Sequence, residues 1–229
     1  MDILTWLIGK RCQKISSFGG LYLFKPENAP VGAPARCTDG CPVERQCPYS
    51  AIRIYIDEHT SPGDFIKPIL NPTEESKWEA LRAGPYGRCV YHCDNDVVDH
   101  QVVNMELEGG VTVAFTMCGF TADISRSLKI MGTNGELRAH METNEIEVHD
   151  FVTHNHQVIN AATGLGHGGG DDGLLHTFAR LVRSVDPAER LHSLSSAAIS
   201  VQSHLMAFAA ERSRLEKRVI DLEEFERLV

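Results

Sequence analysis

Regular alternation of apolar and polar side chains between residues 103 and 117 constrains the fold of this chain more than any other feature. Apolar residues occupy every second position of the segment 103–107 and again of the segment 111–117. Because successive side chains of a β-strand point to opposite faces, this period indicates strands with one apolar face. Gly109-Gly110 between the two segments provides the backbone freedom of a tight turn. The pattern therefore predicts an antiparallel hairpin.

The same period continues toward the C-terminus. Two alternating segments, 126–131 and 136–141, flank Asn134-Gly135, a dipeptide typical of hairpin turns, and a third alternating segment follows at 145–151. Consecutive antiparallel strands of this kind predict an open, twisted β-sheet that needs another layer to cover its apolar face.

The sequence indicates helices both before and after these strands. Residues 2–8 place apolar side chains on one helical face ahead of Gly9, a residue typical of helix C-termini. Asp171 stands at the start of a second amphipathic segment, 171–182, and a third covers 194–209. Because the strands mostly precede the helices, we predict an α+β fold: a largely antiparallel open sheet with helices packed on one face, as a two-layer sandwich.

Composition narrows the classes of function. The 22 Lys and Arg residues against 31 Asp and Glu residues give a formal charge of −9, which repels polyanions and argues against nucleic-acid binding. No apolar stretch approaches the roughly 20 residues of a membrane span. Seven cysteines, an odd number, are typical of a reducing compartment. We therefore expect a cytoplasmic protein without nucleic-acid or membrane partners.

The segment from Gly164 to Gly170 contains the pattern G-x-G-x-x-G just ahead of the predicted helix. As a dinucleotide-binding fingerprint it is weak, because a polar loop expected at 153–163 replaces the buried strand that should end at the first glycine. Two interpretations remain for it. One is a loop whose backbone lies close to a ligand, with His167 exposed at its tip, and the other is a structural entry to the helix.

Three thiols lie close together in a proline-rich segment, with the spacing Cys37-x3-Cys41-x5-Cys47. Thiolates at such spacing suit a structural zinc ion, which requires a fourth ligand. Three residues near position 90 offer that ligand: Cys89, His92 and Cys93. We predict a metal set completed by Cys93. A group of reduced thiols that shapes the loop and a redox pair are the alternatives.

Several further segments are distinctive because of their joint order along nearly the whole chain. They include Asp2-Ile-Leu-Thr-Trp-Leu, Ala33-Pro-Ala-Arg-Cys37, Cys47-Pro-Tyr-Ser-Ala51, Gly87-Arg-Cys-Val-Tyr91, Asp94-Asn-Asp-Val-Val-Asp-His-Gln101, Gly166-His-Gly-Gly-Gly-Asp171 and Ser203-His-Leu-Met-Ala-Phe-Ala-Ala-Glu-Arg-Ser213. This combination resembles the C-terminal domain of the Gfo/Idh/MocA oxidoreductases.

The resemblance implies one half of a two-domain enzyme. Members of this family pair an N-terminal Rossmann domain, which binds NAD or NADP, with a C-terminal domain that shapes the substrate pocket and mediates oligomerisation. The family's Glu-Lys-Pro motif has no counterpart here, and its Asp-x-x-x-His pair normally lies upstream of the helix that starts at Asp2. We therefore expect that the natural chain begins earlier and that this chain alone is inactive.

By the same resemblance, the chain would contribute substrate selection. His167 and Asp171, with Arg126 at a strand start, would face the hydroxyls of a sugar or polyol, although Arg126 is equally well explained as a surface cation. We expect residues 1–229 to form one substrate-binding and oligomerisation domain, with a Cys-rich insertion at about 25–98, and to assemble as a homo-oligomer. The alternative is a non-catalytic, zinc-stabilised interaction module.

Overall fold

The computed structural model describes residues 1–57, 73–122, 125–161, 166–186 and 197–228. The chain divides into two compact units, here named unit A and unit B. Unit A consists of Gln13–Phe120 and Ala210–Asp221. Unit B consists of Met1–Cys12, Thr121–Ala209 and Leu222–Val229.

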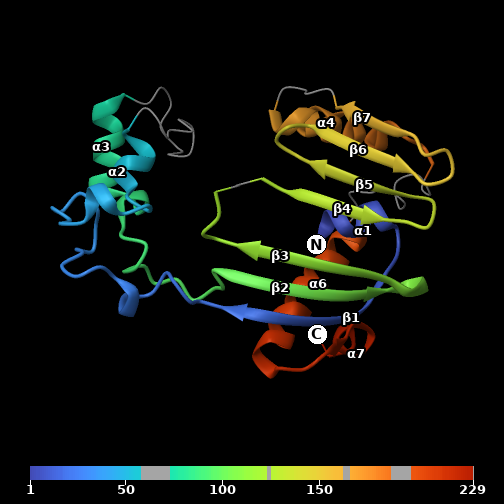
Figure 1. Cartoon of the computed structure of the whole chain (residues 1–229), viewed down its shortest axis with the longest axis horizontal. Coiled ribbons are helices and arrows are strands. Elements are labelled where there is room, and N and C mark those ends of the chain that lie inside the picture. The colour runs from blue at the N-terminus through green and yellow to red at the C-terminus, as the bar shows by residue number, and fades with distance from the viewer. Residues whose placement is uncertain (58–72, 123–124, 162–165, 187–196, 229) are drawn as a thin grey trace. The chain divides into compact units, whose positions relative to one another are not determined.

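A four-stranded sheet in the order β3-β2-β1-β8 forms the centre of unit A (Figure 1). Its strands are β1 (Cys12–Gly20), β2 (His100–Leu107), β3 (Val111–Cys118) and β8 (Ile220–Asp221). β2 and β3 pair in antiparallel register, with Leu107 opposite Val111. The turn between them, η4 (Glu108–Gly110), has positive φ angles of 74° at Gly109 and 77° at Gly110. The predicted hairpin is confirmed.

The alternation along β2 buries one face of this sheet. Val103, Met105 and Leu107 are 0%, 3% and 1% exposed, whereas the residues between them are exposed. Ile15 of β1 and Ile220 of β8 are buried as well. Each such side chain contributes roughly 1.5–3 kcal/mol when it leaves water, so these residues hold the four strands together.

The C-terminal part of α6 (Ala197–Glu216) is tied to β1 of unit A by Ser213. The Ser213 hydroxyl accepts a hydrogen bond from the Ser17 amide at 3.0 Å and donates one to the Arg218 carbonyl at 2.6 Å. Ser213 is 1% exposed. Because a buried hydroxyl is costly without partners, these two bonds set the position of the helix end on the strand.

Residues 21–99 leave the sheet between β1 and β2, and we call this segment the excursion. Its described helices are η1 (Pro26–Asn28), η2 (Glu44–Gln46), α2 (Ala51–Tyr55), α3 (Glu74–Ala83) and η3 (Pro85–Gly87). The sequence does not indicate α2, because five residues show no recognisable apolar period. Ser50 caps α2 by accepting a hydrogen bond from the Arg53 amide.

A second four-stranded sheet, in the order β4-β5-β6-β7, forms part of unit B (Figure 1). Its antiparallel strands are β4 (Ser127–Met131), β5 (Gly135–His140), β6 (Glu145–Asp150) and β7 (His156–Asn160). The first three confirm the predicted meander. The expectation of a polar loop over 153–163 is wrong for β7, which is an exposed edge strand without the alternation that marks a half-buried one.

The described helices of unit B are α1 (Asp2–Ile8), α4 (Gly166–Arg183), the first part of α6, and α7 (Leu222–Glu226). α1 ends at Gly9 with a φ of 65°, as predicted. The expectation that the helix following the glycine segment starts at Asp171 is wrong, because α4 already begins at Gly166. Gly169, in the first part of this helix, has a φ of 89°, which glycine adopts without steric strain. The helix is therefore irregular at this residue.

The architecture is α+β, with open sheets whose registered strand pairs are antiparallel, which confirms the predicted fold class. The strands are divided between two sheets instead of one continuous meander. Among the helices that the structure describes, none combines the length and the apolar character that a membrane span requires.

We expect Gly87→Ala to destabilise unit A. A Cβ atom at Gly87 would lie 1.8 Å from the Leu81 carbonyl oxygen, which belongs to the backbone of α3 and cannot turn away. The free energy of unfolding, measured by urea denaturation, should fall by at least about 2 kcal/mol. Gly20→Ala is the matched control, because a Cβ atom there meets nothing within 4 Å. Equal stability of the two variants would contradict the packing described here.

Candidate functional site

The residues expected to bind substrate lie on separate elements of unit B. Arg126 is exposed and directly precedes β4, where its carbonyl accepts a hydrogen bond from the Met141 amide at 3.0 Å. Asp171 is an exposed residue of α4. His167 lies in the first turn of the same helix, and its side chain falls outside the described part of the structure. Arg126 and Asp171 are therefore accessible to a ligand, and their substrate-binding role stays a prediction.

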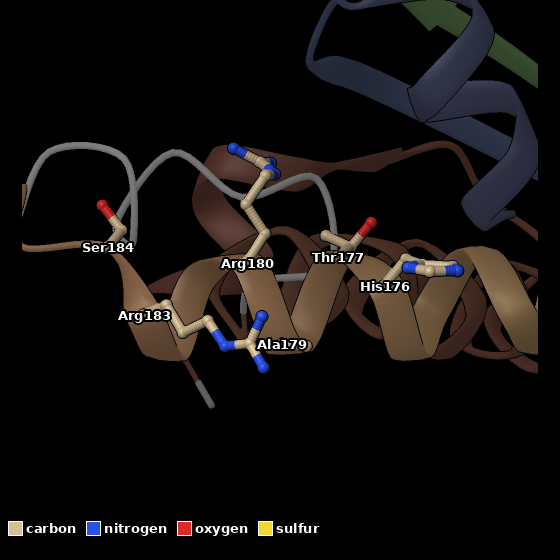
Figure 2. Close-up of a pocket in the computed structure, with 6 residues that line it drawn as sticks. All are labelled: His176, Thr177, Ala179, Arg180, Arg183 and Ser184. Carbon is tan, nitrogen blue, oxygen red and sulfur yellow. The ribbon is translucent and has the colours of Figure 1, made fainter.

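A hollow of about 560 Å³ lies along α4, and its described lining comes from this helix and from Ser184 directly after it. Figure 2 shows these residues, which are His176, Thr177, Ala179, Arg180, Arg183 and Ser184. Arg180 and Arg183 point to opposite sides of the helix in this view (Figure 2). The two guanidinium groups therefore do not form a joint clamp for one anion.

A cluster of potential metal ligands lies on the polar face of the unit B sheet. His149 of β6 faces His156 of β7 in the register, and their rings stack with centroids 4.2 Å apart. Glu147 lies two residues before His149 and therefore on the same face. Among the described residues, these three are the group whose ligand atoms all lie within 4.8 Å of one another. No spacing in the sequence marks His149 and His156 as a pair, because their proximity depends on the pairing of β7 with β6.

A hollow of about 230 Å³ borders this cluster at one end of the sheet, and His149, Asp150 and Glu136 are among its lining residues. Glu136 lies 3.4 Å from Lys129 Nζ and 3.3 Å from Arg138 Nη2. Partial burial would raise the pKa of Glu136, but these two cations outweigh it and lower the pKa below its usual value. This end of the sheet is a polar surface with charges of both signs.

In unit A, the buried carboxylate of Asp99 accepts a set of convergent hydrogen bonds. The amides of Tyr22, Leu23 and Phe24 donate to it at 3.0, 2.6 and 3.2 Å, and His100 Nδ1 lies at 2.9 Å. Burial by itself would raise the pKa of Asp99, but these hydrogen bonds outweigh it and lower the pKa to about 2. Asp99 is therefore ionised at neutral pH and anchors the start of the excursion.

The His100 side chain is 43% exposed beside this carboxylate. Its ring makes an edge contact with Tyr22 at 6.3 Å and a tilted contact with Phe120 at the same centroid distance. Bonding of Nδ1 to a carboxylate orients the imidazole and favours the tautomer with a proton on that nitrogen. Asp99 and His100 belong to the distinctive segment 94–101, but the sequence does not indicate that the carboxylate is buried or that it accepts three amides.

The cysteines of the predicted metal set are only partly brought together. Cys37, Cys41 and Cys47 line one small cavity of unit A, and Cys89 lines it with them. Cys93 is absent from the described lining of this cavity, and its thiol donates a hydrogen bond to the Cys89 carbonyl at 3.2 Å. The structure thus gathers the three predicted thiols of the C-x3-C-x5-C motif at one cavity, together with Cys89. The metal set that Cys93 completes stays a prediction.

Asp99→Asn should lower the free energy of unfolding at pH 7 by about 2 kcal/mol, which is the energy equivalent of the lowered pKa. Because ionisation of Asp99 is favoured in the folded state, its contribution is complete above pH 4 and is lost as the pH falls toward 2. The stability difference from wild type, measured by urea denaturation, should shrink over this range. Asp96→Asn, at an exposed carboxylate, is the control. A difference independent of pH would contradict this role.

No protein-family model and no curated protein sequence matches this chain. Solved structures do match it. An NAD-binding oxidoreductase from Klebsiella pneumoniae aligns with a TM-score of 0.57 and 13% identity, over 96% of this chain and 47% of the oxidoreductase. Levoglucosan dehydrogenase in complex with NADH and levoglucosan aligns with a TM-score of 0.53 and 13% identity, over the same shares.

A third similar structure is the super-repressor mutant of Gal80p from Saccharomyces cerevisiae, with a TM-score of 0.57 and 11% identity over 98% of this chain and 47% of Gal80p. The chain thus spans about half the length of the proteins it matches. At these identities the comparison concerns the fold alone. The chain has the fold of one half of these proteins, and its resemblance to the C-terminal domain of the Gfo/Idh/MocA oxidoreductases is confirmed at the level of the fold.

Proposed function

We propose that this chain is the substrate-binding and oligomerisation half of an NAD(P)-dependent oxidoreductase that acts on a sugar or polyol. The observation that carries this proposal is the alignment of nearly the whole chain with about half of an NAD-binding oxidoreductase. Levoglucosan dehydrogenase, whose structure contains NADH and an anhydrosugar, has the same fold over the same share of its length, which supports a sugar-like substrate.

The division of labour follows from the chemistry of hydride transfer. The reaction needs a nicotinamide held against the substrate and a group that accepts a proton. A Rossmann cradle requires parallel strands, whereas each strand pair with a resolved register in the described part of this chain is antiparallel. NAD or NADP would therefore be bound by an N-terminal Rossmann domain, which is the partner of this chain in the complete enzyme.

Within this half, hydroxyl recognition falls to exposed polar side chains of unit B. Asp171 offers two acceptor oxygens and Arg126 offers a fork of donors, and both are exposed. His167 at the start of α4 completes the proposed set. Sugars and polyols present paired donors and acceptors, so a carboxylate and a guanidinium group are suitable partners for adjacent hydroxyls.

Two titrations of the 229-residue chain test this assignment. Calorimetry with NADH should show no binding. An NMR titration with levoglucosan and with sorbitol should shift amides near Arg126 and Asp171, and Asp171→Asn should weaken that binding by about tenfold, the loss of one good polar contact. Asp172→Asn is the matched control, because Asp172 is exposed on the same helix. Tight NADH binding would contradict the proposal that a separate domain binds the nucleotide. Equal sugar binding by both variants would contradict the assignment of Asp171 to the substrate site.

A homo-oligomer is proposed on the apolar residues of α4. Leu174, Leu175, Phe178 and Val182 are between 58% and 65% exposed and recur at helical spacing. Phe178→Glu should therefore reduce the mass measured by light scattering to that of a monomer, whereas His176→Glu, on the other side of the helix, should leave the mass unchanged. A wild-type chain that is monomeric at high concentration would refute this assembly.

A second candidate function is a non-catalytic interaction module. It is supported by the super-repressor mutant of Gal80p, which has the same fold over about half its length. The complete protein distinguishes the two candidates. Reduction of NAD or NADP in the presence of a polyol supports the oxidoreductase, and nucleotide binding without turnover on any sugar or polyol supports the module.

A further inference from the structure

Four cysteines from separate stretches of the excursion meet at one cavity of about 10 Å³. They are Cys37, Cys41, Cys47 and Cys89. Space of this size accommodates about one water molecule or one ion. Four thiols that line one small cavity match the ligand number of a structural zinc site.

Backbone hydrogen bonds hold the two distant parts of this set together. Arg36 and Arg88 form an antiparallel bridge, flanked by a bond from the Cys37 amide to the Gly87 carbonyl and one from the Cys89 amide to the Ala35 carbonyl, both at 2.9 Å. Cys37 and Cys89 therefore lie on paired backbone segments. Their proximity depends on the backbone of the excursion and does not require an ion.

The Cys37 sulfur has a backbone partner in the excursion. The Ala51 amide at the start of α2 donates a hydrogen bond to it. Backbone N–H groups that donate to a sulfur stabilise its thiolate form. Thiolates that lie close together repel one another, and a divalent cation would offset this repulsion.

The other two residues that could complete the set are engaged elsewhere. The Cys93 thiol donates to the Cys89 carbonyl, and His92 Nε2 lies 3.0 Å from the Ala33 carbonyl. His92 is exposed, whereas Cys89 is 7% exposed. Cys89 is therefore the better fourth ligand, in place of Cys93.

Three arginines adjoin cysteines of the set, and the carboxylate of Glu44 lines the cavity with the thiols. Arg36 and Arg88 directly adjoin Cys37 and Cys89 in the chain, and Arg53 Nη1 donates to the Cys47 carbonyl at 3.3 Å. Arg36 also donates to the carbonyls of Leu81 and Gly84. Four thiolates and one zinc ion carry a net charge of −2, so neighbouring guanidinium groups stabilise the loaded site.

In the described parts of the excursion, residues 21–57 and 73–99, the apolar core is small. Its cluster of fully buried apolar residues consists of Ala51 and Leu81, with Cys37 among the partly buried residues packed against them. A small core of this kind supplies little stability, and small folds of this type commonly rely on a metal ion or disulfides. None of the seven cysteines, all of which lie in the described ranges, forms a disulfide.

We propose that Cys37, Cys41, Cys47 and Cys89 bind one zinc ion through four thiolates and that this ion stabilises the excursion. Binding transfers the thiol protons to solvent, so the site loads with proton release and empties on acidification. The four sulfurs line the cavity without forming a tight ligand set, since the tight set among the described residues is Glu147, His149 and His156. Closure on the ion therefore involves rotation of the cysteine side chains.

Elemental analysis of the purified, reduced 229-residue chain tests the proposal. We expect about one zinc ion per chain in wild type and in Cys93→Ser, and a loss of about tenfold or more in Cys89→Ser. The double variant His149→Ala with His156→Ala should retain its zinc. Metal that disappears with the two histidines, or with Cys93 and not Cys89, would overturn the assignment, as would metal-free wild type or a chain containing iron and sulfide.

Cobalt substitution covers the case in which Cys89→Ser does not fold. Wild type freed of zinc and titrated with Co²⁺ should develop intense sulfur-to-metal charge-transfer bands, with visible bands typical of tetrahedral coordination. Alkylation followed by mass spectrometry should then show Cys37, Cys41, Cys47 and Cys89 protected by the ion and Cys93 modified. Weak octahedral bands, or equal modification of all five thiols, would refute a four-thiolate site.

Discussion

The buried carboxylate of Asp99 closes the base of the excursion, and the organisation of unit A depends on this closure. The Asp99 backbone amide donates a hydrogen bond to the Gly20 carbonyl at 3.0 Å, and the Asp99 carboxylate accepts hydrogen bonds from the amides of residues 22–24. Both ends of a long segment are thereby held at neighbouring strands. Because the entropic cost of loop closure grows only slowly with length, one charge-assisted set of hydrogen bonds is able to secure so large an insertion.

Beyond this closure the excursion is held by backbone pairing more than by apolar burial. The bridge between Arg36 and Arg88 brings Cys37 close to Cys89, and Gly87 permits an approach to α3 that no larger residue allows. The proposed zinc ion would add a covalent-like link at the same place. In the two proposals, the metal that stabilises the excursion lies in unit A and the residues that meet substrate lie in unit B.

In unit B, the ionisable and apolar side chains that could bind a partner lie mainly at the surface. The cross-strand pair His149 and His156 and the carboxylate of Glu147 lie on one face of the sheet, while α4 exposes both apolar and basic side chains. Surfaces of this kind are suited to contacts with a second domain or a second copy. They agree with a protein half whose pocket would be completed by another domain, as in the proposed oxidoreductase.

Local periodicity was sufficient to predict the β2–β3 hairpin, the strands β4 to β6 and α1, because each depends on nearby residues and turn glycines. The sequence also determined which thiols of the C-x3-C-x5-C motif belong together. Only the tertiary structure decided that β7 pairs with β6, that His149 meets His156, and that Cys89 instead of Cys93 lines the thiol cavity. These features depend on register and on contacts between distant segments, and neither leaves a periodic signal in the chain.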